Sequence, residues 1–166
     1  MAQTKRSSQP EIKPVDNKIT RDLESARRVL RLETEALTTL ANCLDEGFSG
    51  TLDLFESVTG RIVVTGMGKS GHIACKIAAT LSSTGTPALF VHPAEASHGD
   101  LGMIASTDAV LAFSNSGETH ELSDIIAYTR RFKIPLIAIT AGAESTLVEA
   151  ADISLVLPDC EEACPM

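Results

Sequence analysis

The stretch RIVVTGMGKSG, residues 61–71, decides the fold of this chain. Its residues 62–65 form a short apolar, β-branched run with a glycine close to either end, which is the pattern of a strand buried on both faces. The glycines that follow allow the backbone to turn tightly and to approach a ligand closely. The helix predicted next points its free N–H groups back toward this turn. A strand, a glycine turn and a helix in this order favour an α/β domain that binds an anion.

The same alternation of strand and helix continues along the chain. Four further apolar runs predict buried strands, at residues 88–91, 109–113, 135–139 and 153–157. Helical patterns lie between them, at residues 73–83, 118–132 and 145–150. Such alternation indicates βαβ units, so we expect a three-layer αβα sandwich with a five-stranded parallel sheet. Sheets of this kind bind ligands beyond the carboxyl ends of their strands.

A long amphipathic helix is predicted before this region. Apolar side chains fall on one stripe from Ile19 to Leu44, which indicates a helix of roughly 25 residues, and a shorter helix then ends at Gly60. An apolar stripe that extends beyond the sheet usually meets another subunit. Residues 1–15 are polar and are expected to form a disordered tail, so the domain would comprise residues 16–166.

Composition narrows the classes of function. A chain of 166 residues suits one compact domain, and a net charge of −8 argues against nucleic-acid binding, which needs a basic face. No apolar run is long enough to cross a membrane, and the first residues lack a signal-peptide pattern, so we expect a cytoplasmic protein. The four cysteines are expected to be reduced thiols. Cys160 and Cys164 lack the further ligands of a zinc site, so no metal is expected.

The glycine loop at residues 66–71 partly fits two nucleotide-binding motifs. A Walker A loop would need glycine at position 63, where this chain has Val63. The dinucleotide motif GxGxxG fits as spelled, but it also needs an acidic residue at the end of the second strand, where His92 stands. No cofactor is therefore expected, although NAD binding and a turn without any ligand remain alternatives.

The third strand runs into SNSGET, residues 114–119. The hydroxyls of Ser114, Ser116 and Thr119 and the amide of Asn115 surround a glycine at the start of a predicted helix. Hydroxyls and backbone N–H groups at such a position can hold a phosphate. A single serine could simply cap the helix. Three hydroxyls at a strand end, next to a second glycine loop, favour the anion, and neutral donors suit a chain of net negative charge.

Titratable side chains are predicted around this phosphate site. They are Lys69 in the glycine loop, His92, Glu95 and His98 after the second strand, and Glu121 after the hydroxyls. Together they make a plausible acid–base set at one rim of the sheet. Three of them also have a structural interpretation: Lys69 as a solvated charge, Glu121 as a partner of the helix dipole, and His92 as a residue that holds its own loop.

Three motifs in this order and spacing closely resemble the sugar isomerase (SIS) domain of the D-arabinose 5-phosphate isomerase family. They are GMGKSG at 66–71, FVHPAEASHGDLG at 90–102 and SNSGET at 114–119, and the resemblance covers residues 19–166. SxSGET marks the wider SIS superfamily, whereas the other two indicate the arabinose 5-phosphate branch. The resemblance implies interconversion of D-ribulose 5-phosphate and D-arabinose 5-phosphate through an enediol, for Kdo and lipopolysaccharide or capsule synthesis, in a homotetramer.

The resemblance also assigns roles to residues. Lys69, His98 and Glu121 match the catalytic positions, with Glu121 or His98 as the base and Lys69 as the group that stabilises the enediolate. The expected phosphate-binding residues are Ser70, Ser114, Asn115, Ser116 and Thr119. Those expected in the substrate loop are Gly68, His92 and Glu95.

Family members generally continue with a helical segment that carries another active-site histidine, and often with two CBS domains. We therefore expect residues 16–166 to be a SIS domain without these segments, and the activity of this short chain stays open. The alternative function is that of a non-catalytic regulatory SIS module that binds a sugar phosphate.

Overall fold

A computed structural model describes residues 17–163 of the chain. The predicted disordered tail, residues 1–15, lies outside the described residues, as does Cys164. The chain divides into two compact units, residues 1–37 with 161–166 and residues 38–160, which are described separately below.

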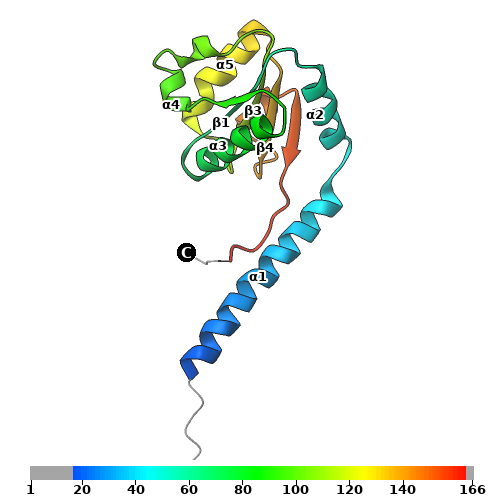
Figure 1. Ribbon diagram of the computed structural model, residues 1–166, viewed down its shortest axis with the longest axis vertical. Helices are drawn as coiled ribbons and strands as arrows, with labels where there is room; N and C mark the ends of the chain where they lie inside the picture. The colour runs from blue at the N-terminus through cyan, green and yellow to red at the C-terminus, as the bar shows by residue number, and fades with distance from the viewer. Residues whose placement is uncertain (1–16, 164–166) are drawn as a thin grey trace, which may run out of the picture. The chain divides into compact units, whose positions relative to one another are not determined.

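Residues 38–160 contain a five-stranded, all-parallel sheet (Figure 1). Its strands are β1 (Ile62–Gly66), β2 (Ala88–Phe90), β3 (Ala109–Phe113), β4 (Leu136–Thr140) and β5 (Ile153–Val156). They lie in the order β2-β1-β3-β4-β5, and Ile62 of β1 is in register with both Ala88 and Ala109. The predicted parallel sheet is confirmed, and every strand begins and ends within one residue of its predicted bounds.

Helices cover both faces of this sheet, so the three-layer prediction is also confirmed. One face packs against α2 (Glu46–Ser57) and α3 (Gly68–Ser83). The other face packs against α4 (Pro93–Ala96), α5 (Ser123–Phe132) and α6 (Thr146–Ala150). Two short 3-10 turns, η1 (Asp100–Met103) and η2 (His120–Leu122), complete the loops.

The central strands are buried because they supply side chains to both cores in turn. In β1, Val63 packs into the core shared with α5, while Ile62 and Val64 pack into the core shared with Ala74 and Ala78 of α3. Successive side chains of a strand point to opposite faces, so a strand covered on both faces is apolar throughout. This explains why the strands could be predicted as continuous apolar runs.

Two helices begin at places other than those predicted. Helix α3 starts at Gly68 rather than at residue 73, because Gly71 allows the first turn to lie directly against the end of β1. The helix predicted from residue 118 begins only at Ser123. Gly117 has a φ of +71°, which ends any helical path there, and residues 120–122 form the turn η2 instead.

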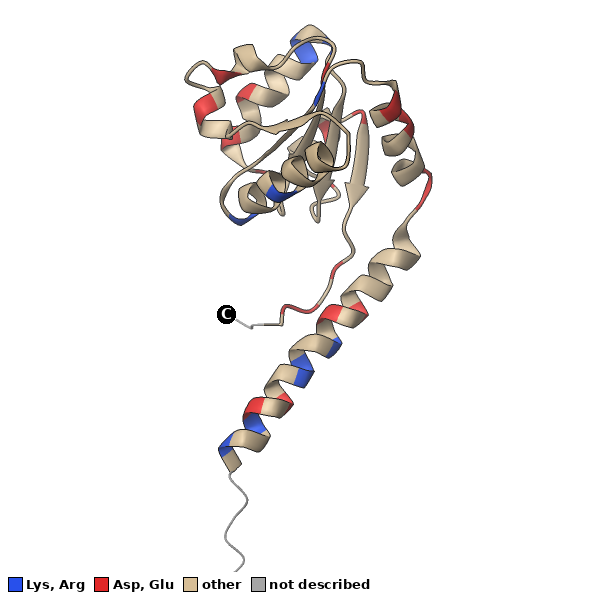
Figure 2. Cartoon of the chain, viewed as in Figure 1, with Lys and Arg blue, Asp and Glu red and all other residues tan. Residues whose placement is uncertain are grey.

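The predicted long helix is confirmed as α1 (Asn17–Cys43), which has no buried residue. It ends before Asp45, which caps α2 by accepting the N–H of Gly47 at 2.9 Å. Within the first unit, Arg28 donates to the carbonyl oxygen of Ala163 at 2.8 Å. Figure 2 shows basic and acidic residues interspersed along this helix. None of the described helices is both long and apolar enough to cross a membrane.

Asp108, directly before β3, is a buried carboxylate that ties together the starts of two strands. Its side chain is 2% exposed and accepts the N–H groups of Arg61 and Ala105, each at 2.8 Å. The guanidinium of Arg61 lies 3.9 Å away. Replacing this carboxylate would leave two partly buried donors without an acceptor.

We therefore expect Asp108→Ala to lower the free energy of unfolding by about 2 kcal/mol, because unsatisfied buried donors cost about 1–3 kcal/mol each. Urea unfolding followed by circular dichroism measures this. The matched control is Asp53→Ala on the exposed surface of α2, expected to change stability by less than about 0.5 kcal/mol. Equal unfolding midpoints for the two variants would show that Asp108 does not hold the strands together.

Candidate active site at the carboxyl edge of the sheet

Three neighbouring strands carry the predicted site residues at their carboxyl ends. β1 leads into the glycine loop, β2 leads into α4 and the turn after it, and β3 leads into residues 114–119. Because the order is β2-β1-β3 and all pairings are parallel, the three loops emerge side by side at one edge of the sheet. The topology thus brings together segments that are far apart in the sequence, as the prediction required.

The glycine loop packs its backbone closely against neighbouring backbone. A Cβ atom on Gly71 would lie 2.6 Å from the carbonyl oxygen of Gly66, and one on Gly66 would lie 3.0 Å from that of Phe113. Met67, the N-cap of α3, makes no side-chain cap hydrogen bond. The first N–H groups of α3 therefore stay available to a ligand beside Lys69 and Ser70.

The hydroxyls of residues 114–119, called the hydroxyl loop below, are drawn together by hydrogen bonds within the loop. Ser114 Oγ and Thr119 Oγ1 are 2.7 Å apart. The N–H of Gly117 donates to Ser114 Oγ at 3.0 Å, and that of Glu118 donates to Ser116 Oγ at 3.1 Å. Within residues 17–163, no hydrogen bond uses the N–H of Ser116 or Thr119. Ser114 is buried, whereas Ser116 is exposed and Thr119 is half-buried. The loop thus presents the hydroxyls of Ser116 and Thr119 together with free N–H donors, a fitting arrangement for a phosphate.

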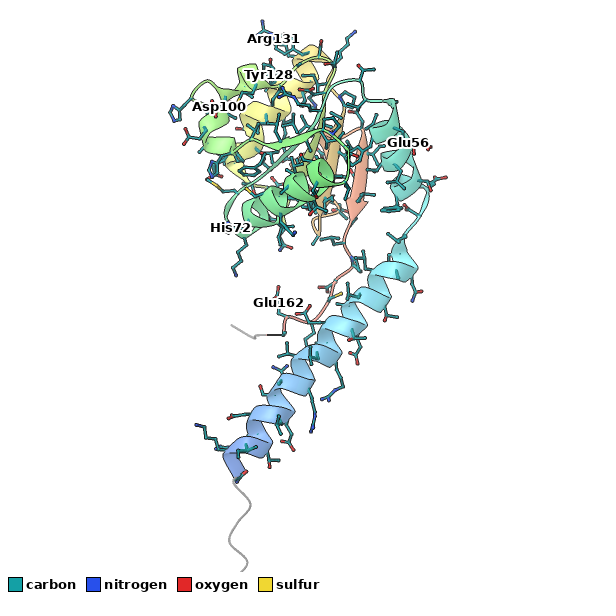
Figure 3. All side chains as sticks on the ribbon, viewed as in Figure 1. Glu56, His72, Asp100, Tyr128, Arg131 and Glu162 are labelled. Carbon is teal, nitrogen blue, oxygen red and sulfur yellow. The ribbon has the colours of Figure 1, made fainter. Side chains whose placement is uncertain are left out.

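The segment after β2 contains one residue with a structural role. His92 Nδ1 accepts the N–H of Ala94 at 3.3 Å and so caps α4, while its ring lies edge-on to Phe90 with centroids 6.2 Å apart. Glu95 belongs to α4. The turn then continues through His98 to Asp100, which is labelled at the outer margin of the domain in Figure 3. His92 therefore holds its own loop, and its predicted place beside the substrate stays a prediction.

Lys69, His98 and Glu121, the predicted catalytic residues, are all exposed. Lys69 lies in the first turn of α3, His98 follows α4, and Glu121 lies in η2. None of the three side chains forms a hydrogen bond or an ion pair with another residue in the described part of the chain. They follow adjacent strands and are free to meet a ligand, and their catalytic roles remain predictions.

Nothing in residues 17–163 groups three His, Cys, Asp or Glu side chains in a way that could hold a metal ion. Cys43, Cys75 and Cys160 are free thiols. The CxxxC pair considered above includes Cys164, which lies outside the described residues.

Glu118 has an interaction that sequence reasoning missed. Its Oε1 accepts the N–H of Thr146 at 2.7 Å, and its Oε2 accepts the hydroxyl of the same residue at 2.8 Å. These donors, the N–H first and the hydroxyl second, lower the pKa of Glu118. The partners are 28 residues apart. The available signal was a threonine at the start of a predicted helix, which does not identify a partner in a distant loop.

Comparison with known proteins bears directly on this arrangement. Residues 57–165 match the SIS domain family, and that range includes the glycine loop, the segment after β2 and the hydroxyl loop. The chain belongs to the SIS domain family. The expected SIS fold and family are therefore confirmed, and the three loops lie within the shared domain.

Curated relatives of this SIS domain are longer proteins. The chain is 52% identical over 143 residues to arabinose 5-phosphate isomerase KdsD of Yersinia pestis, and 49% identical over 144 residues to KdsD of Pseudomonas aeruginosa. These alignments cover 86% and 87% of the chain but 44% of each relative. The chain thus spans less than half the length of these relatives.

A solved structure of an Escherichia coli CFT073 protein in complex with arabinose 5-phosphate has the same fold. Its TM-score is 0.82 at 37% sequence identity, over 90% of this chain and 79% of that protein's chain. Together with the curated relatives, this structure confirms the resemblance to the arabinose 5-phosphate isomerase family.

The lowered pKa of Glu118 predicts a pH-dependent stability difference. Since its pKa is lower in the folded state, the ionised form adds stability above the ordinary value of 4.5, and this contribution is lost as pH falls through the folded pKa. Urea midpoints of the native chain and Glu118→Gln should therefore differ most near neutral pH and converge below pH 4.5.

The matched control for this pH series is Glu144→Gln, an exposed acid in the neighbouring loop. It should leave the urea midpoint close to that of the native chain across the series. A difference between the native chain and Glu118→Gln that stays constant with pH would show that ionised Glu118 adds no stability.

Proposed function

We propose that this SIS domain catalyses the reversible isomerisation of D-ribulose 5-phosphate and D-arabinose 5-phosphate through an enediol, in the supply of Kdo for lipopolysaccharide or capsule. The observation that carries the proposal is the hydroxyl loop at the carboxyl end of β3, in a chain 37% identical to a protein solved with arabinose 5-phosphate. The curated isomerases at 52% and 49% identity support the same reaction.

The phosphate end of the substrate would be held mainly by neutral donors. Ser114, Ser116 and Thr119 supply hydroxyls, and Ser116 and Thr119 also offer free N–H groups. Ser70 in the first turn of α3 and the amide of Asn115 complete the proposed set. Because these donors carry no net charge, a dianion can bind without a basic surface, in keeping with the net charge of −8.

The other end of the sugar would meet the titratable side chains. Moving the carbonyl from C2 to C1 needs a base that removes a proton from the carbon beside the carbonyl and returns it to the adjacent carbon. Glu121 or His98 would do this, and such a base contributes a factor of about 10² to 10⁴. Lys69 would stabilise the negative charge that develops on the enediolate oxygen. No redox cofactor enters this scheme, because the oxidised carbon only changes place within one molecule.

A regulatory module that binds the sugar phosphate without turning it over is the second candidate. The observation that favours it is that the side chains of Lys69, His98 and Glu121 form no hydrogen bond or ion pair that would orient them within the described chain. Both candidates need the hydroxyl loop to bind the sugar phosphate, but only the isomerase needs the titratable side chains to convert it. Measuring binding and turnover separately therefore distinguishes the two candidates.

We also infer that the protein works in the cytoplasm as a homo-oligomer, a tetramer by family resemblance. Residues 17–37 of α1 carry large apolar side chains that are mostly solvent-exposed, including Leu30 and Leu37 at 67% each and Ile19 at 58%. Ile19, Leu23, Leu30 and Leu37 follow one helical stripe. A helix with such a stripe is stabilised by packing against another copy, which supports the oligomer.

An isomerase assay with D-ribulose 5-phosphate tests the proposed reaction. We expect the chain to form D-arabinose 5-phosphate, and Lys69→Ala to lower kcat by at least roughly a hundredfold, because it removes the group that stabilises the enediolate. Lys76→Ala, further along α3, is the matched control and should keep its activity. Ligand binding without turnover in the unchanged chain would support the regulatory module, and equal kcat in both variants would exclude Lys69 as the stabilising group.

Multi-angle light scattering tests the oligomer. The native chain should have a mass well above the 17.6 kDa of one copy, and Leu30→Asp should reduce it, because a charge would be buried in the stripe. Ser25→Asp adds the same charge at an exposed position away from the stripe and should leave the mass unchanged. A native mass of one copy would contradict the inference.

A further inference from the structure

The hydroxyl loop is held by residues 140–147, which run from the end of β4 through a loop to the start of α6 and are called the bracing loop below. The carbonyl oxygen of Asn115 accepts the N–H of Ala141 at 3.0 Å and the hydroxyl of Thr140 at 3.2 Å. The carbonyl oxygen of Gly117 accepts the N–H of Leu147 at 3.1 Å. These bonds use backbone carbonyl oxygens of the hydroxyl loop and none of its hydroxyls.

The two loops approach so closely that side chains are excluded between them. A Cβ atom on Gly117 would overlap the side chain of Ser145, and one on Gly142 would overlap the carbonyl oxygen of Ser116. Gly117 also has a φ of +71°, which other residues rarely adopt. The shape of the hydroxyl loop is therefore set by the loop behind it.

Glu118 adds a charged contact to this backbone packing. Both carboxylate oxygens lie within 2.8 Å of donor atoms of Thr146, at the start of α6. This contact holds the negative charge of Glu118 beside Thr146, although Glu118 belongs to a loop expected to receive a phosphate dianion. A carboxylate released from Thr146 would be free to approach that dianion and repel it.

We propose that Glu118 is a positioning residue for phosphate binding: its two hydrogen bonds to Thr146 hold the hydroxyl loop in the shape that receives the phosphate and keep the carboxylate away from it. This inference rests on the proposed function, since it concerns the phosphate of that substrate. Glu118 itself touches no reacting atom. Its backbone N–H donates to Ser116 Oγ at 3.1 Å, so the position of Glu118 is linked directly to a proposed phosphate-binding hydroxyl.

The proposal explains why an acidic residue stands in a phosphate-binding loop. Groups that hold a ligand work well only when their own positions are fixed by surrounding contacts, within about 0.5 Å. Gly117 allows the tight turn but gives it no rigidity. A bidentate charge-assisted contact to a residue of the neighbouring loop supplies that rigidity.

The test compares Glu118→Ala with Glu118→Gln in the full chain. Alanine removes both contacts, so KM for D-ribulose 5-phosphate should rise at least roughly tenfold, since the loss of even one charge-assisted bond is expected to cost that much, while kcat stays within about twofold. Glutamine can still accept the N–H of Thr146 and donate to its hydroxyl, so it should recover most of the lost affinity. Glu144→Ala, an exposed acid of the bracing loop, is the matched control and should keep the native KM.

Amide hydrogen exchange supplies a readout that needs no substrate. Glu118→Ala should speed exchange at the N–H of Leu147, which bridges the two loops, while the N–H of Val110 in β3 keeps its protection. In an active chain, a native KM in Glu118→Ala would overturn the proposal, whatever the exchange at Leu147. So would a lower kcat at unchanged KM, which is the result expected if the substitution only reduces the folded fraction.

The design also separates failure of this inference from failure of the proposed function. If the unchanged chain neither binds nor converts D-ribulose 5-phosphate, the proposed function is wrong. In that case faster exchange at Leu147 in Glu118→Ala still supports the inference that Glu118 holds the hydroxyl loop in shape, and unchanged exchange overturns it. If the unchanged chain is active and Glu118→Ala matches it in KM, only the inference about Glu118 is wrong.

Discussion

The close packing of α3 against the end of β1 is the constraint on which the rest of the structure depends. Gly71 lies so near the carbonyl oxygen of Gly66 that a Cβ atom would stand 2.6 Å from it. Because the helix can begin there, it covers one face of the sheet from its first turn, and its uncapped N–H groups stay at the carboxyl edge. The contact between Gly71 and Gly66 thus lets α3 cover the core and also places its free N–H groups at the candidate site.

Strand order then decides which loops share that edge. β1 lies between β2 and β3, so the glycine loop has the segment after β2 on one side and the hydroxyl loop on the other. The parallel pairing keeps all three at the same end of the sheet. An acidic chain gains an anion site in this way, since the site depends on oriented N–H and hydroxyl donors more than on the net charge of −8.

The sequence could predict the sheet because strands covered on both faces must be apolar along their whole length, as Ile62, Val63 and Val64 are. The phosphate-binding hydroxyls and the glycine loop could also be predicted, because serine, threonine and glycine at a strand end are themselves the residue types that an anion site needs. The start of α5 and the contact of Glu118 could not. The start of α5 is delayed by the positive φ of Gly117, which residue type alone does not reveal, and no local pattern encodes the partner of Glu118, which lies 28 residues away.

The two ends of the proposed substrate would meet surfaces of different character. The hydroxyl loop is fixed by bonds to its own backbone and to residues 140–147, whereas the side chains of Lys69, His98 and Glu121 are exposed and form no hydrogen bond in the described chain. A phosphate held by the braced loop would fix the position of the sugar carbons before the exposed side chains act on them. Binding energy from the part of a substrate that does not react can thus lower the barrier at the part that does, provided that the loop holding it keeps its shape.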